Sequence, residues 1–351
     1  AETALSHASG RPSRPEAGST EEVRCSMKDK IDVKTICTRV AYTLALPVLL
    51  YAAMCVLRPD VYLNGSALVT LFKQSLSYTL VGWSMVFGMS CGLFDFSVGA
   101  RYLVAALFGI HMSQYFGVPG FVLGVLLSSL LLAGLTGAIF AGLKIPSIIT
   151  GFAALLIFES AAAIYQTKFS VIVTENISAF GRSPGIYVMT AITFVVVYIL
   201  FNRTKFGYQI KAIGGNEKVA RSMGIKAVQL KVLTYVIGGL ILGLAALCKV
   251  GFDQSVRAMT NMASMSAAFT PMMAVMIGLY LGSCNPVVGV IVGSFSISVV
   301  SSGLVALGIN YRLQNVFIGV FLVIFIGYKM NAGRIRALFR RKPGHQKGQS
   351  A

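Results

Sequence analysis

A carboxylate at position 95 is the first residue in this sequence whose type and position could carry chemistry. Asp95 stands between two long apolar runs and is flanked by Gly92 and Gly99. Such a carboxylate can face a cavity from a broken membrane helix. It can equally cap the following helix, in company with Ser97, and we favour this second interpretation. The two are compatible, so Asp95, Phe96 and Ser97 are candidate residues of a polar pathway.

A second carboxylate and a lone histidine lie inside apolar runs. Glu159 is a functional-site candidate by default, because an ionised side chain is costly in a membrane. It could instead reach the membrane interface, or pair with Arg101 or His111. His111 has no second histidine near it, so a hydrogen-bonded structural role is favoured over metal binding. We predict no metal site.

Several kinds of chemistry are missing from the sequence. It contains no G-x-x-x-x-G-K-[ST] motif, so the chain cannot cradle ATP phosphates by that device. It also has no H-E-x-x-H motif, no Ser-His-Asp set, and no cysteines at metal-ligand spacing. We therefore expect a protein that is not an enzyme and holds no cofactor of its own. Any energy source must be another subunit or an ion gradient.

The longest polar interruption of the apolar sequence runs from residue 206 to residue 225. Its middle predicts one short amphipathic helix, with Asn216 as N-cap, Glu217 in the first turn and Gly224 as the stop. Three apolar side chains are expected to share one face of this helix: Val219, Ala220 and Met223. The helix is either a plain connector between two spans or a docking element for a soluble partner.

Two motifs carry a resemblance to a known family. The run Gly207…Ala212-Ile-Gly-Gly-Asn-Glu217, followed by Ala220 and Ser222-Met-Gly-Ile225, resembles the cytoplasmic loop of ribose-type sugar ABC transporter permeases. Branched-chain amino acid permeases share this family. Upstream, Gly92-Leu-Phe-Asp-Phe-Ser-Val-Gly99 is similar to the family's Gly-Ile-Asp-Leu-Ser-Val-Gly signature. The resemblance covers roughly residues 40 to 330.

The resemblance implies that this loop couples the membrane protein to an ATPase subunit by seating in a groove of that subunit. The coupling residues it implies are Gly214, Gly215, Asn216, Glu217, Val219, Ala220, Met223, Gly224 and Ile225. The chain departs from the family at Glu159-Ser160, where Arg-Gly is frequent, and at Ala267-Ala268, near which an acidic residue is usual. These departures suggest a divergent permease and leave both a homodimer and a heteromeric pair open.

The composition is that of a membrane protein. Hydrophobic residues make up 56% of the chain and charged residues 12%, against about 45–50% and about 25% in soluble domains. The net charge of +18 would suit nucleic acid, but 21 of the 30 Lys and Arg lie in residues 1–39, 202–231 and 329–351. These blocks flank or separate apolar runs, so the charge indicates topology by the positive-inside rule and we expect no nucleic-acid partner.

We therefore predict an all-α polytopic membrane protein with about ten transmembrane helices and both termini cytoplasmic. The expected spans are 40–57, 67–93, 98–116, 119–143, 147–165, 187–201, 230–250, 266–283, 286–307 and 312–328. Residues 1–39 are expected to be a disordered basic tail, of which 1–26 could be an extension before a start at Met27. The permease domain is placed at 40–328, with its coupling loop at 202–231, and a second basic tail at 329–351.

The function that follows from the resemblance is the membrane-spanning subunit of a bacterial ABC importer in the inner membrane. Its expected partners are a cytoplasmic ATPase that binds the ATP, a second permease subunit and an extracytoplasmic binding protein that delivers a simple sugar. A permease for nucleosides or amino acids is an alternative with the same architecture. The alternative from another class is an ion-coupled secondary transporter that uses Asp95 and Glu159 as ion or proton sites.

Overall fold

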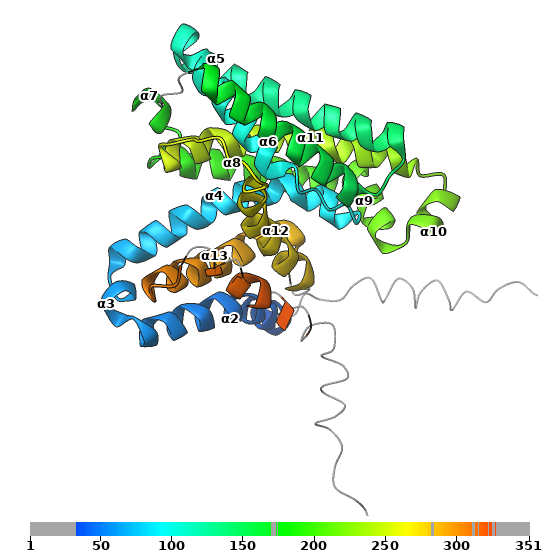
Figure 1. Cartoon of the computed structure of the whole chain (residues 1–351). Coiled ribbons are helices and arrows are strands. Elements are labelled where there is room, and N and C mark those ends of the chain that lie inside the picture. Colours follow the sequence, from blue (N-terminus) through cyan, green and yellow to red (C-terminus); the bar gives the residue numbers. More distant parts are fainter. Residues whose placement is uncertain are drawn as a thin grey trace, which may run out of the picture.

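The computed structural model describes residues 33–169, 173, 175–281, 284–310, 313–314, 316–321, 323–324 and 327. In these ranges all regular structure is helical (Figure 1), which confirms the predicted all-α class. The helices that lie wholly within these ranges are α2 (Val33–Leu57), α3 (Pro59–Tyr62), α4 (Gly65–Ser90), α5 (Val98–Leu143), α6 (Ser147–Lys168), α7 (Glu175–Ser178), α8 (Gly185–Arg203), α9 (Lys205–Gly215), α10 (Glu217–Ser222), α11 (Ala227–Asp253), α12 (Ser264–Leu281) and α13 (Pro286–Ala306). Apart from 33–39, which begin α2, the two predicted tails lie outside the described residues.

Within the described part of the chain, seven helices are long and apolar enough to cross a membrane: α2 from Val40 onward, α5, α6, α8, α11, α12 and α13. Helix α5 comprises two stretches that meet at Gly117, whose φ of 61° interrupts the helix between the predicted spans 98–116 and 119–143. The chain is therefore a multi-pass membrane protein, although the count of ten is not confirmed. In the predicted span at 312–328, the described residues 313–314, 316–321, 323–324 and 327 are all helical.

Helix α4 corresponds to the predicted span 67–93 but is less apolar than the seven helices above. The reason is its place in the bundle, where it packs against α11, α12 and α13 and is buried mainly from Leu71 onward. Its buried positions accordingly include Ser75, Ser77, Thr79 and Ser84. Three of the four hydroxyl groups bond carbonyl oxygens of the helix itself, which satisfies them without water. A central helix can thus be more polar than its lipid-facing neighbours.

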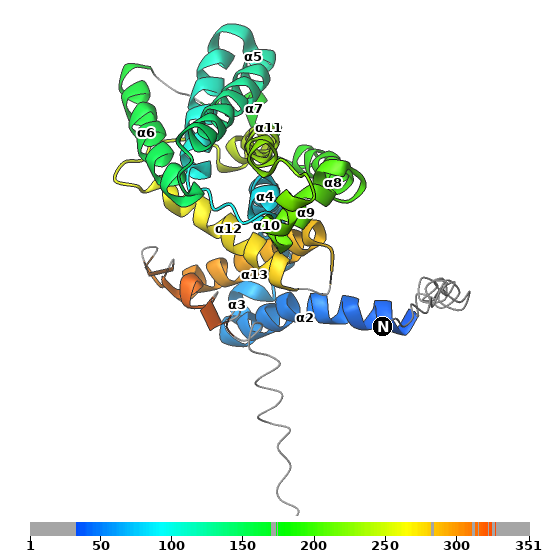
Figure 2. The same ribbon diagram turned by 90° about the vertical axis from the view of Figure 1, so that its right-hand side faces the viewer.

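The two ends of the bundle carry different short helices (Figure 1). Helices α9 and α10 project at one end, which we call the α10 end, and α3 and α7 lie at the opposite end, the α3 end. Figure 2 views the α10 end, with α9 and α10 near the middle, α2, α12 and α13 on one side and α5 and α6 on the other. Close backbone contact holds α12 to α13, because a Cβ on Gly278 would lie 2.6 Å from the carbonyl carbon of Gly289.

Candidate functional site

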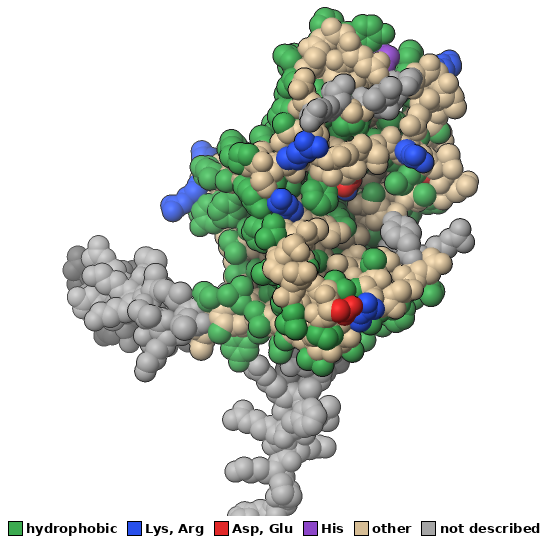
Figure 3. Space-filling view, turned by 90° about the vertical axis from the view of Figure 1, so that its left-hand side faces the viewer, with side chains coloured by type: hydrophobic (Ala, Val, Ile, Leu, Met, Phe, Trp, Pro, Cys, Tyr) green, Lys and Arg blue, Asp and Glu red, His purple; other side chains and the backbone are tan. Residues whose placement is uncertain are grey.

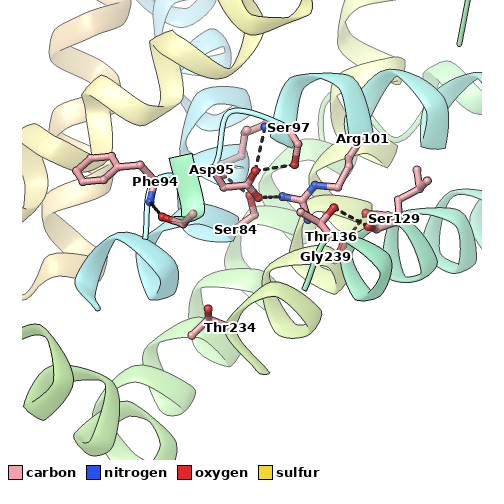
Figure 4. Close-up of polar contacts among 12 residues, drawn as sticks. Ser84, Phe94, Asp95, Ser97, Arg101, Ser129, Thr136, Thr234 and Gly239 are labelled. Carbon is pink, nitrogen blue, oxygen red and sulfur yellow. Dashed lines mark hydrogen bonds and ion pairs between the residues drawn. The ribbon is translucent and has the colours of Figure 1, made fainter. Parts of the chain in front are cut away.

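Asp95 lies in the linker 91–97, between α4 and α5 at the α10 end. Its Oδ1 accepts hydrogen bonds from the Ser97 amide (2.9 Å) and the Ser97 hydroxyl (2.6 Å), and its Oδ2 pairs with the Arg101 guanidinium (Figure 4). Both charged side chains are nearly buried, at 12% and 4% exposure. Ser97 occupies the N-cap position of α5 but makes no side-chain capping bond. Asp95 therefore organises the linker through Arg101, one turn into α5, so Arg101 is not the partner of Glu159, which was one of the alternatives for that carboxylate.

The rest of this linker packs tightly against α6. The Phe94 amide donates to the Ser147 hydroxyl at 3.2 Å, and the Phe96 ring stacks on Phe152 with centroids 4.7 Å apart. On its other side Phe96 lies 5.8 Å from the ring of Phe269 in α12. Phe96 thus wedges between α6 and α12. It does not line any of the cavities described below, whereas Asp95 does.

A small cavity of about 30 Å³ lies beside the ion pair. Asp95, Arg101, Thr234 and Tyr235 contribute its polar wall, together with Ser84. The Tyr235 hydroxyl and the Nε and Nη1 of Arg101 are buried and bond no protein atom in the described part of the chain. The volume suits one or two water molecules, which such groups ordinarily bind. The cavity is too small for a sugar, so it offers no sugar passage beside Asp95.

Glu159 lies in the middle of α6 and is 3% exposed. Its Oε2 accepts hydrogen bonds from the hydroxyl of Ser264 and, at 3.3 Å, from the Ser264 amide. Since α12 begins at Ser264, the carboxylate is placed at the N-terminus of that helix, where the helix dipole favours a negative charge. Helix α12 therefore accounts for Oε2, whereas Oε1 is buried and bonds no protein atom in the described ranges. The pairings of Glu159 with Arg101 or His111 are not found. His111 lies instead among aromatic rings, the closest being Phe169 at 4.6 Å.

A larger cavity of about 320 Å³ opens among α4, α5, α11, α12 and α13, toward the α3 end. We call it the polar cavity. Its hydrogen-bonding lining comprises Tyr78, Tyr102, Lys249, Asp253, Ser255, Arg257, Ser266, Thr270, Ser301 and Gln314. Its size falls at the lower end of the range for small-ligand pockets, which is about 300–1,000 Å³. A molecule of a few hydroxyl groups would find both donors and acceptors in it.

The charges in the polar cavity are unequal. Lys249 Nζ pairs with Asp253 Oδ2 at 2.7 Å, one turn along α11, and lies 5.7 Å from the ring centroid of Tyr102. Arg257 is exposed and bonds no other residue in the described ranges. One positive charge is thus left for a ligand or for solvent. Figure 3, which views the α3 end, shows Lys and Arg scattered over the surface and few Asp or Glu.

The predicted amphipathic helix at the α10 end exists as α10. Asn216 caps it, its Oδ1 accepting from the Lys218 and Val219 amides at 3.0 and 3.2 Å, and Gly224 ends it with a φ of 83°. Glu217 pairs with Arg221 at 2.6 Å and reaches across to Lys231 of α11 at 2.8 Å. These hydrogen bonds, from Lys231 first and Arg221 second, hold the pKa of Glu217 below the usual value for glutamate.

One part of the prediction for this helix is wrong. Val219, Ala220 and Met223 do not share an exposed face: Ala220 is 2% exposed and packs into the protein, whereas Val219 and Met223 are 53% and 74% exposed. Packing explains the split, because the three positions fall within an arc of about 100° and only the edge that carries Ala220 is turned toward the rest of the protein. The exposed apolar surface of α10 therefore consists of Val219 and Met223.

These features can now be compared with known proteins. The family model described as "Branched-chain amino acid transport system / permease component" matches residues 67–326, about three quarters of the chain. The chain belongs to this permease family. Its linker 91–97, its polar cavity lining and helix α10 all fall inside the matched region.

Curated relatives of this permease are importer subunits by name. It is 26% identical to the ribose import permease protein RbsC of Bacillus subtilis (strain 168), over 77% of this chain and 86% of that protein. It is 27% identical to the L-arabinose transport system permease protein AraH of Escherichia coli (strain K12), over 73% and 80%. The autoinducer 2 import system permease protein LsrC of Salmonella choleraesuis (strain SC-B67) is 24% identical, over 82% and 83%.

Sequence reasoning missed the charged residues of the polar cavity in this permease. Lys249, Asp253 and Arg257 fit the topology as charges near the end of a span, and nothing in their spacing singled out a site. One signal was available, because a Lys and an Asp four residues apart on a helix that is otherwise apolar form an i,i+4 pair that membrane helices rarely carry. Met259 also lines the cavity, whereas Met272 and Met273 of α12 are buried packing residues.

Proposed function

We propose that this chain is the membrane-spanning permease subunit of a bacterial ABC importer for a simple sugar, located in the inner membrane. The match of the permease family over residues 67–326 carries the proposal, and the names of the ribose and arabinose relatives suggest the substrate class. The polar cavity is the proposed substrate contact. Hydroxyl, amide and charged groups on several helices line it, and they would replace part of the hydration shell of a sugar.

The partners proposed are a cytoplasmic ATPase, a second permease subunit and an extracytoplasmic binding protein. The ATPase would bind the ATP and dock on α10, where Val219 and Met223 offer exposed apolar side chains. The binding protein would dock at the α3 end, toward which the polar cavity opens. In this arrangement the permease performs no covalent chemistry and needs no cofactor of its own.

Mechanistically, the permease would alternate between two states, each open toward one side of the membrane. ATP binding and hydrolysis act on the ATPase, whose movement reaches this chain through α10 and shifts the balance between the two states. A shift from 1:99 to 99:1 needs a difference of about 5.5 kcal/mol in binding free energy between the states. The ATPase is the natural source of a difference that large.

The ion-coupled alternative is disfavoured by the bonds of the two carboxylates it would use, although the Oε1 of Glu159 is buried and bonds no protein atom in the described ranges. Asp95 is paired with Arg101, and Glu159 is bonded to Ser264. An amino acid is a better second candidate for the substrate, because the family model is described by branched-chain amino acid transport. Asp253 and Arg257 in the polar cavity could also face an ammonium and a carboxylate group.

Uptake into proteoliposomes tests the proposal. The permease is reconstituted with its ATPase, identified by co-purification, and with a candidate binding protein, and ATP-dependent uptake of labelled ribose, arabinose, a nucleoside and leucine is measured. Sugar uptake that needs ATP is expected. Uptake driven by a proton or sodium gradient without the ATPase would overturn the importer, and ATP-dependent uptake of leucine alone would move the substrate class to amino acids.

Docking on α10 is tested by Val219→Asp and Met223→Asp, which place charge on its exposed apolar surface. Both are expected to release the ATPase during purification while the permease stays folded in the membrane. Ala220→Trp is a poor choice for this purpose, because Ala220 is buried and a bulky residue there would disturb the permease itself.

A further inference from the structure

Two sets of polar contacts fasten the pair α9–α10 to the membrane helices. The first joins α10 to α11 through Glu217 and Lys231, whose Oε2 and Nζ are 2.8 Å apart. The second starts in α9, where Lys211 Nζ donates to Asn202 Oδ1 at the end of α8, at 3.1 Å. Asn285 Nδ2 donates to the same oxygen at 2.7 Å. We call the three residues Lys211, Asn202 and Asn285 the α9–α13 bridge.

The bridge ends on the first turn of α13. The other end of the Asn285 amide, Oδ1, accepts from the Val287 amide at 3.0 Å and so forms the N-cap of α13. Asn285 therefore bonds Asn202 with one end of its side chain and its own helix with the other. Lys211 is further held by the rings of Phe201 and Tyr208, whose centroids lie 4.4 and 5.6 Å from its Nζ. Every side chain of the bridge is thus fixed at both ends.

The helices fastened at the α10 end are the ones that line the polar cavity toward the α3 end. Helix α11 carries Lys231 near its start and Lys249 in the cavity wall, and α13 carries Asn285 at its cap and Ser301 in the wall. At 1.5 Å per residue, the sixteen residues from Asn285 to Ser301 span roughly 24 Å. A continuous helix can move as one element over such a length, so a displacement at Asn285 can reach Ser301.

We propose that the α9–α13 bridge carries the movement of the coupling helices α9 and α10 to α13, and so to the wall of the polar cavity. Lys211, Asn202 and Asn285 are then positioning residues for transport. The inference rests on the proposed function, because it requires an ATPase that moves α10. It adds a second connection to the Glu217–Lys231 contact, which reaches α11.

A purely structural bridge would make a different prediction. Polar groups at helix ends are commonly bonded to one another only because they are buried. Removing such a bond lowers stability but leaves the number of sugar molecules moved per ATP unchanged. The ratio of uptake to ATP hydrolysis, measured in the assembled importer, therefore separates the two roles.

The variants follow from the contacts. Asn202→Leu removes the shared acceptor, whereas Asn202→Asp keeps an oxygen for both donors. Asn285→Ser retains an N-capping side chain but cannot reach Asn202, and Lys211→Met keeps the stem over Phe201 without the charge. Lys205→Met is the matched control, because Lys205 is an exposed lysine of the same helix with no partner in the described ranges.

Uptake and ATP hydrolysis are measured in proteoliposomes with the complete importer. Asn202→Leu, Asn285→Ser and Lys211→Met are expected to keep ATP hydrolysis within about twofold of wild type and to lower sugar moved per ATP by at least about tenfold. Asn202→Asp and Lys205→Met should leave the ratio unchanged. If Asn202→Leu does not assemble, the other two bridge variants decide.

Three outcomes would overturn the bridge: an unchanged ratio in assembled bridge variants, equal losses in Asn202→Leu and Asn202→Asp, or the same loss in Lys205→Met. Failure of the proposed function is visible separately, since the wild-type complex would then show no ATP-dependent sugar uptake at all. A wild-type complex that transports sugar, with bridge variants that keep its ratio, refutes the bridge alone.

Discussion

Two linkers in this permease each join one long helix to the next, but they differ in the pairing of their charges and in the size of the neighbouring cavity. The linker 91–97 connects α4 to α5 at the α10 end, and the linker 254–263 connects α11 to α12. In the first, the charge of Asp95 is paired with Arg101 and the neighbouring cavity holds only about 30 Å³. In the second, Arg257 is unpaired among the described residues and the neighbouring polar cavity holds about 320 Å³.

The two linkers also differ in backbone conformation, as their residues with positive φ show. The linker 91–97 has one residue with positive φ, Gly92 at 79°, and glycine adopts that conformation at no steric cost. The linker 254–263 has three such residues that are not glycine: Gln254, Asn261 and Met262. Strained backbone of this kind is retained where surrounding structure or function requires it. The comparison indicates that the first linker packs tightly around its ion pair, whereas the second forms part of the wall of the polar cavity.

The linkers are not independent, because their flanking helices touch. A Cβ on Gly99, in the first turn of α5, would lie 2.0 Å from the carbonyl oxygen of Ser264, in the first turn of α12. Ser264 in turn is held by Glu159. The linkers 91–97 and 254–263 thus meet at a backbone contact between the first turns of α5 and α12. Any change that separates α5 from α12 should affect both.

The largest effect is expected from Gly99→Leu, which inserts a side chain into this contact. Because the obstacle is backbone and cannot rotate away, the cost should exceed the usual overpacking penalty of about 1–3 kcal/mol. We expect loss of monodisperse, detergent-purified protein and of uptake. Gly134→Leu is the control, since a Cβ at Gly134 meets nothing within 4 Å. A stable, active Gly99→Leu protein would show that the two linkers are not coupled here.

The next-largest effect is expected on stability, at the ion pair of the linker 91–97. Arg101→Met leaves the Asp95 carboxylate buried without its partner, and breaking a buried ion pair in this way costs about 3–5 kcal/mol. Thermal unfolding in detergent should show a large drop in stability for Arg101→Met. The double variant Asp95→Asn/Arg101→Met should recover much of it, because no unpaired charge remains. Equal stability of the single and double variants would mean that the pair does not hold the linker.

The contrast between the linkers also explains how far sequence analysis could go. The helices followed from apolar runs, and the break of α5 at Gly117 falls between the predicted runs 98–116 and 119–143. Residues 216–224 formed the predicted capped helix because Asn216 and Gly224 act through local bonds. The partners of Asp95 and Glu159 did not follow, because both carboxylates lie near several polar side chains and the choice depends on helix packing. The buried side of Ala220 was missed for the same reason.

A smaller effect, on uptake, is expected at Arg257 in the linker 254–263. If its guanidinium donates to substrate hydroxyls in the polar cavity, Arg257→Gln should lower uptake at saturating loaded binding protein by roughly two- to fivefold, the range for an exposed charged contact. The half-saturating concentration of binding protein should not change. A rise in that concentration with an unchanged maximal rate would assign Arg257 to docking of the binding protein instead, and the cavity would lose its charged ligand contact.

The smallest effect concerns how the attachment of α10 to α11 through Glu217 depends on pH. Hydrogen bonds from Lys231 and Arg221 lower the pKa of Glu217 from its ordinary value of 4.5. A carboxylate with a lowered folded-state pKa contributes stability that is complete above the unfolded-state pKa and disappears as pH falls through the folded-state value. The α10 attachment should therefore be unchanged down to a pH of about 4.5 and weaken only below it.

A spin label at Met223→Cys, in a variant without the other cysteines, reports this attachment, because residue 223 is exposed just beyond α10. Label mobility should rise only below the ordinary pKa of glutamate. In Glu217→Gln it should be higher at neutral pH and should no longer change with acidification. A pH-dependent mobility that persists in Glu217→Gln would assign the titration to another group. The α10 end would then be held together by the α9–α13 bridge and the Asp95–Arg101 pair, without a contribution from Glu217.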